Sequence, residues 1–117
     1  MVHMKLMNSK AEFDVSIQSS NLVVAVFKAD WCGDCTYINP FMPEVEEKYA
    51  DSLSLIQVDV DKVEEVSQEQ NILGIPSFVA YTDGRELIRF VNKNRKSREE
   101  IETFLDRAVE VYKSIHK

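Results

Sequence analysis

The only two cysteines of the chain, Cys32 and Cys35, are separated by two residues, and the only tryptophan, Trp31, precedes them directly. Two thiols at this spacing can meet across one turn of a helix. There they can exchange disulfides, bind a metal ion or form a buried structural pair. The segments on either side of the pair favour the first of these.

An apolar strand is predicted before the pair and a helix after it. Residues 22–28 are almost continuously apolar, which is typical of a strand covered on both faces. The segment after Cys35 carries Tyr37, Ile38 and Phe41 at helical spacing. The dithiol therefore lies where a strand passes into a helix, a context that favours redox chemistry.

At this junction, Cys32 is the candidate nucleophile and Cys35 the candidate resolving thiol. Unpaired N–H groups and the helix dipole favour a thiolate at Cys32, which would attack a substrate disulfide. Cys35, one turn later and less exposed, would then attack Cys32 and release the reduced substrate. A metal site needs about four ligands. Because His3 and His116 stand at opposite ends of the chain, we expect no metal.

Hydrophobic periodicity, caps and turn residues predict the other elements. Pro40 and Pro43 should kink the helix after Cys35, because each removes a backbone donor. The order β-α-β-α-β-α-β-β-α predicts an α/β fold, a mixed central sheet with helices on both faces. The remaining expected elements are an edge strand at 3–6, a helix at 10–19, a strand at 53–60, a helix at 62–71 capped by Asp61, strands at 77–81 and 86–91 joined by Asp83-Gly84, and a helix at 98–115.

Length and charge restrict the functional classes. At 117 residues the chain predicts a single domain, residues 1–117. A net charge of −6 argues against nucleic-acid or anionic-membrane partners. The sequence shows neither an apolar run of about 20 residues nor a secretory signal, so we expect a cytoplasmic protein.

The order of these motifs resembles the thioredoxin family over nearly the whole chain. Trp31-Cys32-Gly33-Asp34-Cys35 differs from the family's Trp-Cys-Gly-Pro-Cys at one position, and Gly74-Ile75-Pro76 matches its cis-proline segment. The resemblance implies a thioredoxin fold and a thiol–disulfide oxidoreductase that reduces protein disulfides in electron transport. The redox-active Cys32–Cys35 disulfide would serve in place of a cofactor. A separate reductase would recycle it, and we expect a monomer.

The resemblance also implies a substrate groove beside Cys32. Trp31, Gly74, Ile75 and Pro76 would line it. With a cis Ile75–Pro76 bond, the backbone of Ile75 would bind an extended substrate segment like an added strand. The alternative function is a redox-weak binding module that docks partners beside Pro76, but retention of both cysteines and of Pro76 argues against it.

Two residues depart from the family pattern. Asp34, which with Gly33 would modulate the site, places a negative charge near Cys32. This charge opposes the thiolate and makes the pair more reducing, unless solvent screens it. Val26 stands where the family has a buried Asp, and Gln57 where it often has that carboxylate's lysine partner. We therefore expect slow deprotonation of Cys35 and a slow resolving step.

Cations near the site have two interpretations each. Lys28 is interpreted as a surface lysine at a strand end, with a thiolate-stabilising cation as the alternative. The basic residues within 92–98 are interpreted as a solvated loop and helix start. The resemblance implies that this cluster lies close to the substrate groove, and selection of acidic partners is the alternative for it.

Overall fold

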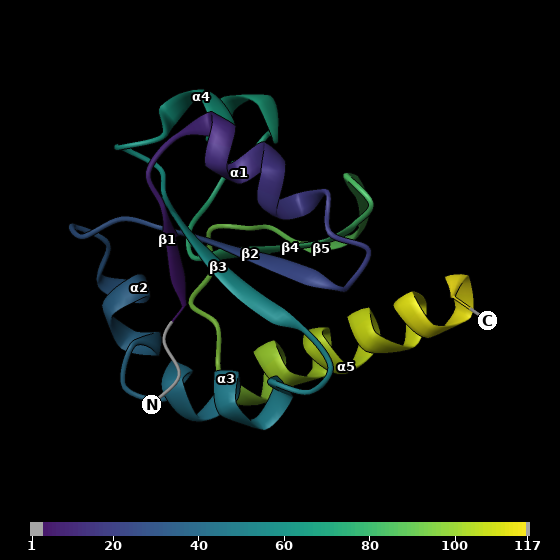
Figure 1. Ribbon diagram of the computed structural model, residues 1–117. Helices are drawn as coiled ribbons and strands as arrows, with labels where there is room; N and C mark the ends of the chain where they lie inside the picture. The colour runs from purple at the N-terminus through teal and green to yellow at the C-terminus, as the bar shows by residue number, and fades with distance from the viewer. Residues whose placement is uncertain (1–3, 117) are drawn as a thin grey trace.

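The computed structural model describes residues 4–116, which form five strands and five helices (Figure 1). The elements are β1 (Lys5–Met7), α1 (Lys10–Ile17), β2 (Val23–Lys28), α2 (Gly33–Ile38), α3 (Met42–Tyr49), β3 (Ser54–Asp59), α4 (Glu64–Glu69), β4 (Ser77–Thr82), β5 (Arg85–Phe90) and α5 (Arg98–Ile115).

The strands form one mixed sheet in the order β1-β3-β2-β4-β5. β3 pairs in parallel with both β1 and β2, whereas β4 pairs antiparallel with β2 and β5. The β-α-β-α-β start of the chain supplies the parallel strands, and the Asp83-Gly84 hairpin adds the last antiparallel pair. The predicted mixed central sheet is thus confirmed.

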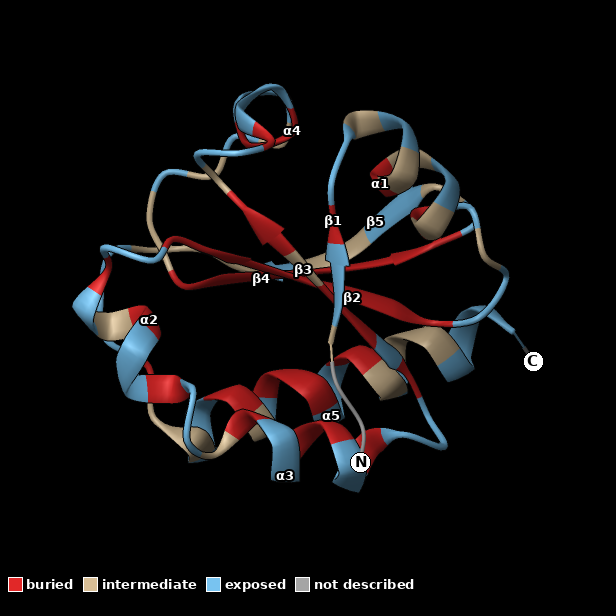
Figure 2. Ribbon diagram, turned by 60° about the vertical axis from the view of Figure 1, so that its left-hand side comes forward, coloured by how far each residue is buried: buried red, intermediate tan, exposed pale blue. Residues whose placement is uncertain are grey.

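Helices cover both faces of the sheet. α1 and α4 lie on one side, α3 and α5 on the other, and α2 stands beyond the end of β2 (Figure 1). Side chains of β2 alternate between two apolar clusters: Val24 and Val26 pack toward α3 and α5, whereas Ala25 and Phe27 pack toward α1 and α4. This double coverage explains the continuous apolar run, and Figure 2 shows the central strands buried.

The segment with the two prolines after the dithiol forms two separate helices, α2 and α3, rather than one kinked helix. Residues 39–41 form a turn that contains Pro40 and separates α2 from α3. Pro43 is the second residue of α3, where its missing N–H group has no intrahelical partner to lose. The segment before this break therefore holds the dithiol in a helix of its own.

The expected helix at 62–71 is shorter than predicted, and Asp61 does not cap it. Val63 is the N-cap of α4, without a side-chain hydrogen bond. The Asp59 carboxylate accepts the N–H groups of Asp61 and Lys62, at 2.9 and 3.2 Å, and orders the turn before α4 instead. Asn71, with a φ of 57°, adopts the left-handed conformation after the helix.

Local signals place the other elements well. The edge strand expected at 3–6 is found at Lys5–Met7, and residue 3 lies outside the described residues. Asp83 and Gly84 both have positive φ, 52° and 78°, as a tight hairpin turn requires. Ser97 and Glu100 form the predicted capping box at the start of α5.

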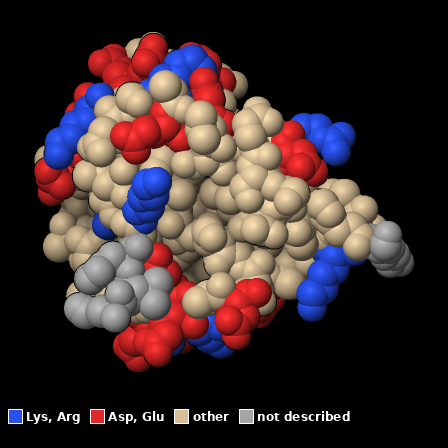
Figure 3. All heavy atoms as spheres, in the orientation of Figure 1, with Lys and Arg blue, Asp and Glu red and all other residues tan. Residues whose placement is uncertain are grey.

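The charge distribution is uneven. On the face shown in Figure 3, most charged side chains, acidic and basic, lie toward the margins, and the broad central area is mostly uncharged. None of the helices within residues 4–116 is long and apolar enough to cross a membrane.

Candidate active site

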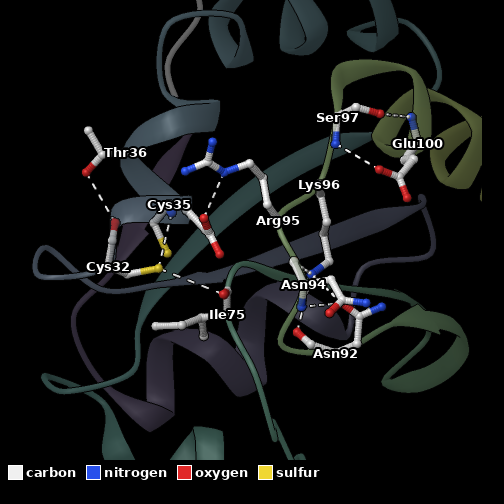
Figure 4. Close-up of polar contacts among 11 residues, drawn as sticks. Cys32, Cys35, Thr36, Ile75, Asn92, Asn94, Arg95, Lys96, Ser97 and Glu100 are labelled. Atoms are coloured by element: carbon white, nitrogen blue, oxygen red, sulfur yellow. Dashed lines mark hydrogen bonds and ion pairs between the residues drawn. The ribbon is translucent and has the colours of Figure 1, made fainter.

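The dithiol lies at the junction of β2 and α2. Cys32 is the N-cap of α2, and its sulfur accepts a hydrogen bond from the Cys35 N–H group at 3.1 Å (Figure 4). Both cysteines are free thiols. Cys32 is 7% exposed and Cys35 only 1%, which is the expected order of accessibility. An incoming disulfide can therefore reach Cys32 before Cys35.

Cys35 is held in its protonated form. Burial raises the pKa of the Cys35 thiol to about 12, and its hydrogen bond with Cys32 acts in the same direction. A hydrogen bond with the Ala29 backbone and the nearby Lys28 ammonium group lower this pKa without cancelling the effect. Charge on the Cys35 sulfur is therefore costly unless a neighbouring group compensates it.

A groove of about 430 Å³ opens beside Cys32. Its side walls carry two exposed apolar side chains, Trp31 (71% exposed) and Leu73 (76% exposed). The Trp31 Nε1–H group donates to the Asp61 carboxylate at 2.6 Å, which fixes the indole at the rim. The lining residues are Trp31, Cys32, Gly33, Asp34, Leu73, Gly74, Ile75 and Lys93.

The Gly74-Ile75-Pro76 segment forms the wall opposite the dithiol. The Ile75–Pro76 peptide bond is cis. The Ile75 carbonyl accepts from the Cys32 thiol at 3.8 Å, so the two segments that the sequence separates meet at this point (Figure 4). Pro76 is buried behind the groove and is not among the lining residues.

Sequence reasoning missed Leu73 as a lining residue. Leu73 is an apolar residue in the loop before Gly74, a local signal that would have identified it. Lys93 belongs to the basic cluster that the resemblance placed close to the groove, and it does line the groove.

Asp34 is paired with a cation that the sequence does not connect to it. The Arg95 Nε–H group donates to the Asp34 carboxylate at 2.9 Å across 61 residues of sequence (Figure 4). The guanidinium group also lies over the Tyr37 ring, 4.5 Å from its centroid. The negative charge beside Cys32 is therefore partly compensated.

Lys96 is the exception within the predicted solvated loop, in which residues 93–95 are exposed. Lys96 itself is 0% exposed. The ammonium group donates to the Asn92 and Asn94 carbonyls, at 3.3 and 3.0 Å, and to the Asn92 side chain at 3.0 Å (Figure 4). It also lies 5.1 Å from the centroid of the Phe90 ring. Burial lowers the pKa of Lys96. Its ammonium group stabilises the loop through its hydrogen bonds to Asn92 and Asn94.

Lys28 is not a surface lysine either. It is 8% exposed, and its ammonium group donates to the Asn39 side-chain oxygen in the turn after α2. Burial lowers the pKa of Lys28. The buried lysine therefore stands close to the dithiol, whereas Val26, two residues earlier, is fully enclosed by apolar side chains.

The described part of the chain contains no group of three or more His, Cys, Asp and Glu side chains that could hold a metal ion. His116 stacks on Tyr112, 4.2 Å between ring centroids, and His3 lies outside the described residues.

Comparison with known proteins matches this geometry to one family. The sequence model of the family described as Thioredoxin matches residues 4–107. Thioredoxin 1 of Plasmodium falciparum is 39% identical over 90 residues, which are 77% of this chain and 86% of the relative. Thioredoxin Asp f 28 of Aspergillus fumigatus is 45% identical over 87 residues, 74% of this chain and 80% of the relative.

Solved structures agree with the sequence comparison. A structure of Plasmodium falciparum thioredoxin has a TM-score of 0.75 at 35% identity and covers 93% of this chain and 99% of its own. A Malassezia sympodialis thioredoxin has a TM-score of 0.81 at 24% identity, with 93% and 96% covered, and supports the fold alone. The predicted thioredoxin fold is confirmed. The chain belongs to the thioredoxin family and is a thiol–disulfide oxidoreductase.

Proposed function

We propose that this protein reduces protein disulfides through its Cys32–Cys35 dithiol. The observation that carries the proposal is the asymmetry of the pair. The Cys32 sulfur accepts a hydrogen bond from the Cys35 N–H group, and Cys32 lines the groove. Cys35 is buried, and burial raises the pKa of its thiol to about 12. Cys32 attacks the substrate disulfide, and Cys35 then resolves the mixed disulfide.

The groove beside Cys32 would bind the polypeptide around the substrate disulfide. The Ile75 carbonyl already lies 3.8 Å from the Cys32 sulfur, within reach of a backbone N–H group of an extended segment. Trp31 and Leu73 offer apolar contacts within the groove. Gly74 contributes backbone to the lining, and the buried Pro76 supports it from behind. Gly33 and the Arg95-paired Asp34 would modulate the reactivity of Cys32.

Reduction of insulin disulfides by dithiothreitol tests this proposal. The wild type should accelerate the reaction, and Cys32→Ser should abolish the acceleration. Cys35→Ser should instead accumulate a mixed disulfide. A reduction potential of about −270 mV or lower would mark a reductant, whereas about −120 mV would mark an oxidant. A wild type that binds peptides in the groove without reducing any disulfide would overturn the proposal in favour of a binding module.

The finer assignments are proposals as well. We propose a single domain over residues 1–117, because both core clusters pack on the two faces of one sheet. A monomer is supported by the scatter of the exposed apolar side chains described in residues 4–116, of which only Trp31 and Leu73 line the groove. Light scattering after gel filtration tests this.

Partners and location follow from the same chemistry. Family members act on protein disulfides and are recycled by a reductase, so we propose protein substrates and a separate reductase for this chain. The net charge of −6 supports protein rather than nucleic-acid or membrane partners. A dithiol that must be kept reduced suits the cytoplasm. Subcellular fractionation distinguishes this from a mitochondrial location, which one relative's name records.

A further inference from the structure

Lys28 is a buried cation that the usual dithiol chemistry does not require. Its ammonium group donates to the Asn39 side-chain oxygen, which is uncharged. The ion pairs formed among residues 4–116 do not include Lys28. Burial of an ammonium group outside an ion pair is costly for the folded state, and burial does lower the pKa of Lys28 although Asp30 attracts its charge. An anion that forms beside Lys28 during function would offset part of this cost.

Lys28 lines a polar cavity of about 160 Å³, enough for several water molecules. Asp59 pairs with Lys28 in the β2–β3 register, but the Asp59 carboxylate accepts two backbone N–H groups of the turn before α4. The groups around Lys28 come from β2 and its following loop, from α2 and its end, and from β3: they are Ala29, Asp30, Cys32, Cys35, Thr36, Asn39, Gln57 and Asp59.

Among these groups, Cys35 stands one helical turn before Asn39, the C-cap of α2, so the two side chains share one face of this segment. The ammonium group that donates to Asn39 therefore lies on the same side of α2 as the Cys35 thiol. In agreement with this placement, Lys28 lowers the pKa of the Cys35 thiol. Residues 26 and 28 of a strand face the same side of the sheet. The apolar Val26 thus leaves Lys28 as the charged side chain that β2 presents on the side of the dithiol.

We propose that Lys28 is a positioning residue for the resolving step, in which its ammonium group is the counter-charge of the Cys35 thiolate. The proposal rests on the assignment of Cys35 as the resolving thiol. Cys35 loses its proton, and its sulfur attacks Cys32 in the mixed disulfide. The Cys32–Cys35 bond forms and the bond from Cys32 to the substrate sulfur breaks. The departing substrate thiolate takes up one proton, and Lys28 stays protonated throughout.

Stopped-flow reaction of the reduced full-length protein with dithiobis-nitrobenzoate separates the two steps. Attack by Cys32 releases the first coloured thionitrobenzoate, and attack by Cys35 on the mixed disulfide releases the second. Lys28→Met removes the charge and keeps most of the side-chain volume, and loss of a buried charge should not weaken the fold. Lys28→Gln keeps a polar group toward Asn39 and serves as a second neutral variant. Lys62→Met is the matched control, because Lys62 is exposed.

The second phase should slow by about 3- to 10-fold in both neutral variants. A neighbouring opposite charge shifts a thiol pKa by about 1 to 2 units. The more basic thiolate is also the better nucleophile, which offsets nearly half of the loss in rate. The rise of the second-phase rate with pH should move to higher pH. Lys28→Arg, which retains the charge, should recover most of the rate. Lys62→Met should match the wild type in both phases.

Three results would overturn the proposal. They are a second phase within twofold of wild type in both neutral variants, an unchanged pH profile, or a Lys28→Arg variant as slow as Lys28→Met although it is folded. A wild type that releases no second thionitrobenzoate would instead refute Cys35 as the resolving thiol, and with it the proposed function. The two failures are therefore distinguishable in one assay.

Discussion

Gly74→Ala should destabilise the protein although alanine suits its backbone conformation. A Cβ atom at residue 74 would lie 2.2 Å from the Asn92 carbonyl oxygen, 2.4 Å from the Asn92 carbonyl carbon and 2.7 Å from the Lys93 nitrogen. All three are backbone atoms, so a side-chain rotation cannot relieve the contact. The two segments must separate by about 1 Å, and overpacking of this kind costs about 2 to 3 kcal/mol.

Denaturant and thermal unfolding measure this cost. For a domain of this size the loss corresponds to a fall in Tm of about 10 °C. Gly33→Ala is the matched control for stability, because no heavy atom lies within 4 Å of the Cβ that it adds. It opens α2 and should leave the free energy of unfolding within about 0.5 kcal/mol of wild type, or raise it. Equal stabilities for the two variants would refute the reasoning.

Gly74→Ala should also change the reactivity of Cys32. Asn92 and Asn94 supply the carbonyls that hold Lys96, and the next residue, Arg95, pairs with Asp34. Displacement of this loop loosens the Asp34–Arg95 pair and slows the attack by Cys32. The first thionitrobenzoate phase, measured well below the Tm, should therefore be slower in Gly74→Ala than in wild type. An unchanged first phase would show that the loop moves without disturbing the pair.

Two further predictions concern charge at the dithiol. Arg95→Leu should slow alkylation of Cys32 by iodoacetamide about two- to threefold, because Asp34 loses its cationic partner. The effect is small because the Asp34–Arg95 pair is exposed, and added salt should reduce it further. The double variant Arg95→Leu/Asp34→Asn should restore the wild-type rate. Cys35 should make stability fall at alkaline pH, since burial raises the pKa of its folded-state thiol to about 12 while the unfolded chain releases this proton near pH 9. Its stabilising contribution is complete below pH 9 and is lost as pH rises toward 12. Between about pH 9 and pH 10, the reduced wild type should lose about 1 kcal/mol more than Cys35→Ala in denaturant unfolding, and equal losses would contradict the assignment.

Most of the fold was predictable because its signals are local. The apolar run of β2, the two prolines after the dithiol and the Asp83-Gly84 turn each act within a few residues. α4 is the exception. Asp61 looks like an N-cap in the sequence, but its carboxylate accepts the Trp31 indole N–H group, and Asp59 orders the turn instead. A short helix with competing carboxylates depends on tertiary contacts that sequence alone does not reveal.

The candidate site was predictable in its sulfur chemistry and in the segment that faces it. The strand-to-helix context of the cysteines identifies the dithiol from the residues themselves. The meeting of Cys32 with Ile75, 43 residues away, was implied only by the family resemblance. The resemblance also implied that the basic cluster containing Lys93 lies near the groove, whereas the groove residue Leu73 came from neither argument.

The pairing and burial of the charges around the dithiol could not be predicted, and they alter the expected redox behaviour. Asp34 alone would oppose the Cys32 thiolate and favour the disulfide. In the structure Arg95 pairs with Asp34, and Lys28, which donates to the C-cap residue of α2, is a second cation close to the dithiol. Positive charge stabilises thiolates and hence the reduced dithiol. The bias toward a more reducing couple that Asp34 suggests in the sequence is therefore opposed by these two cations.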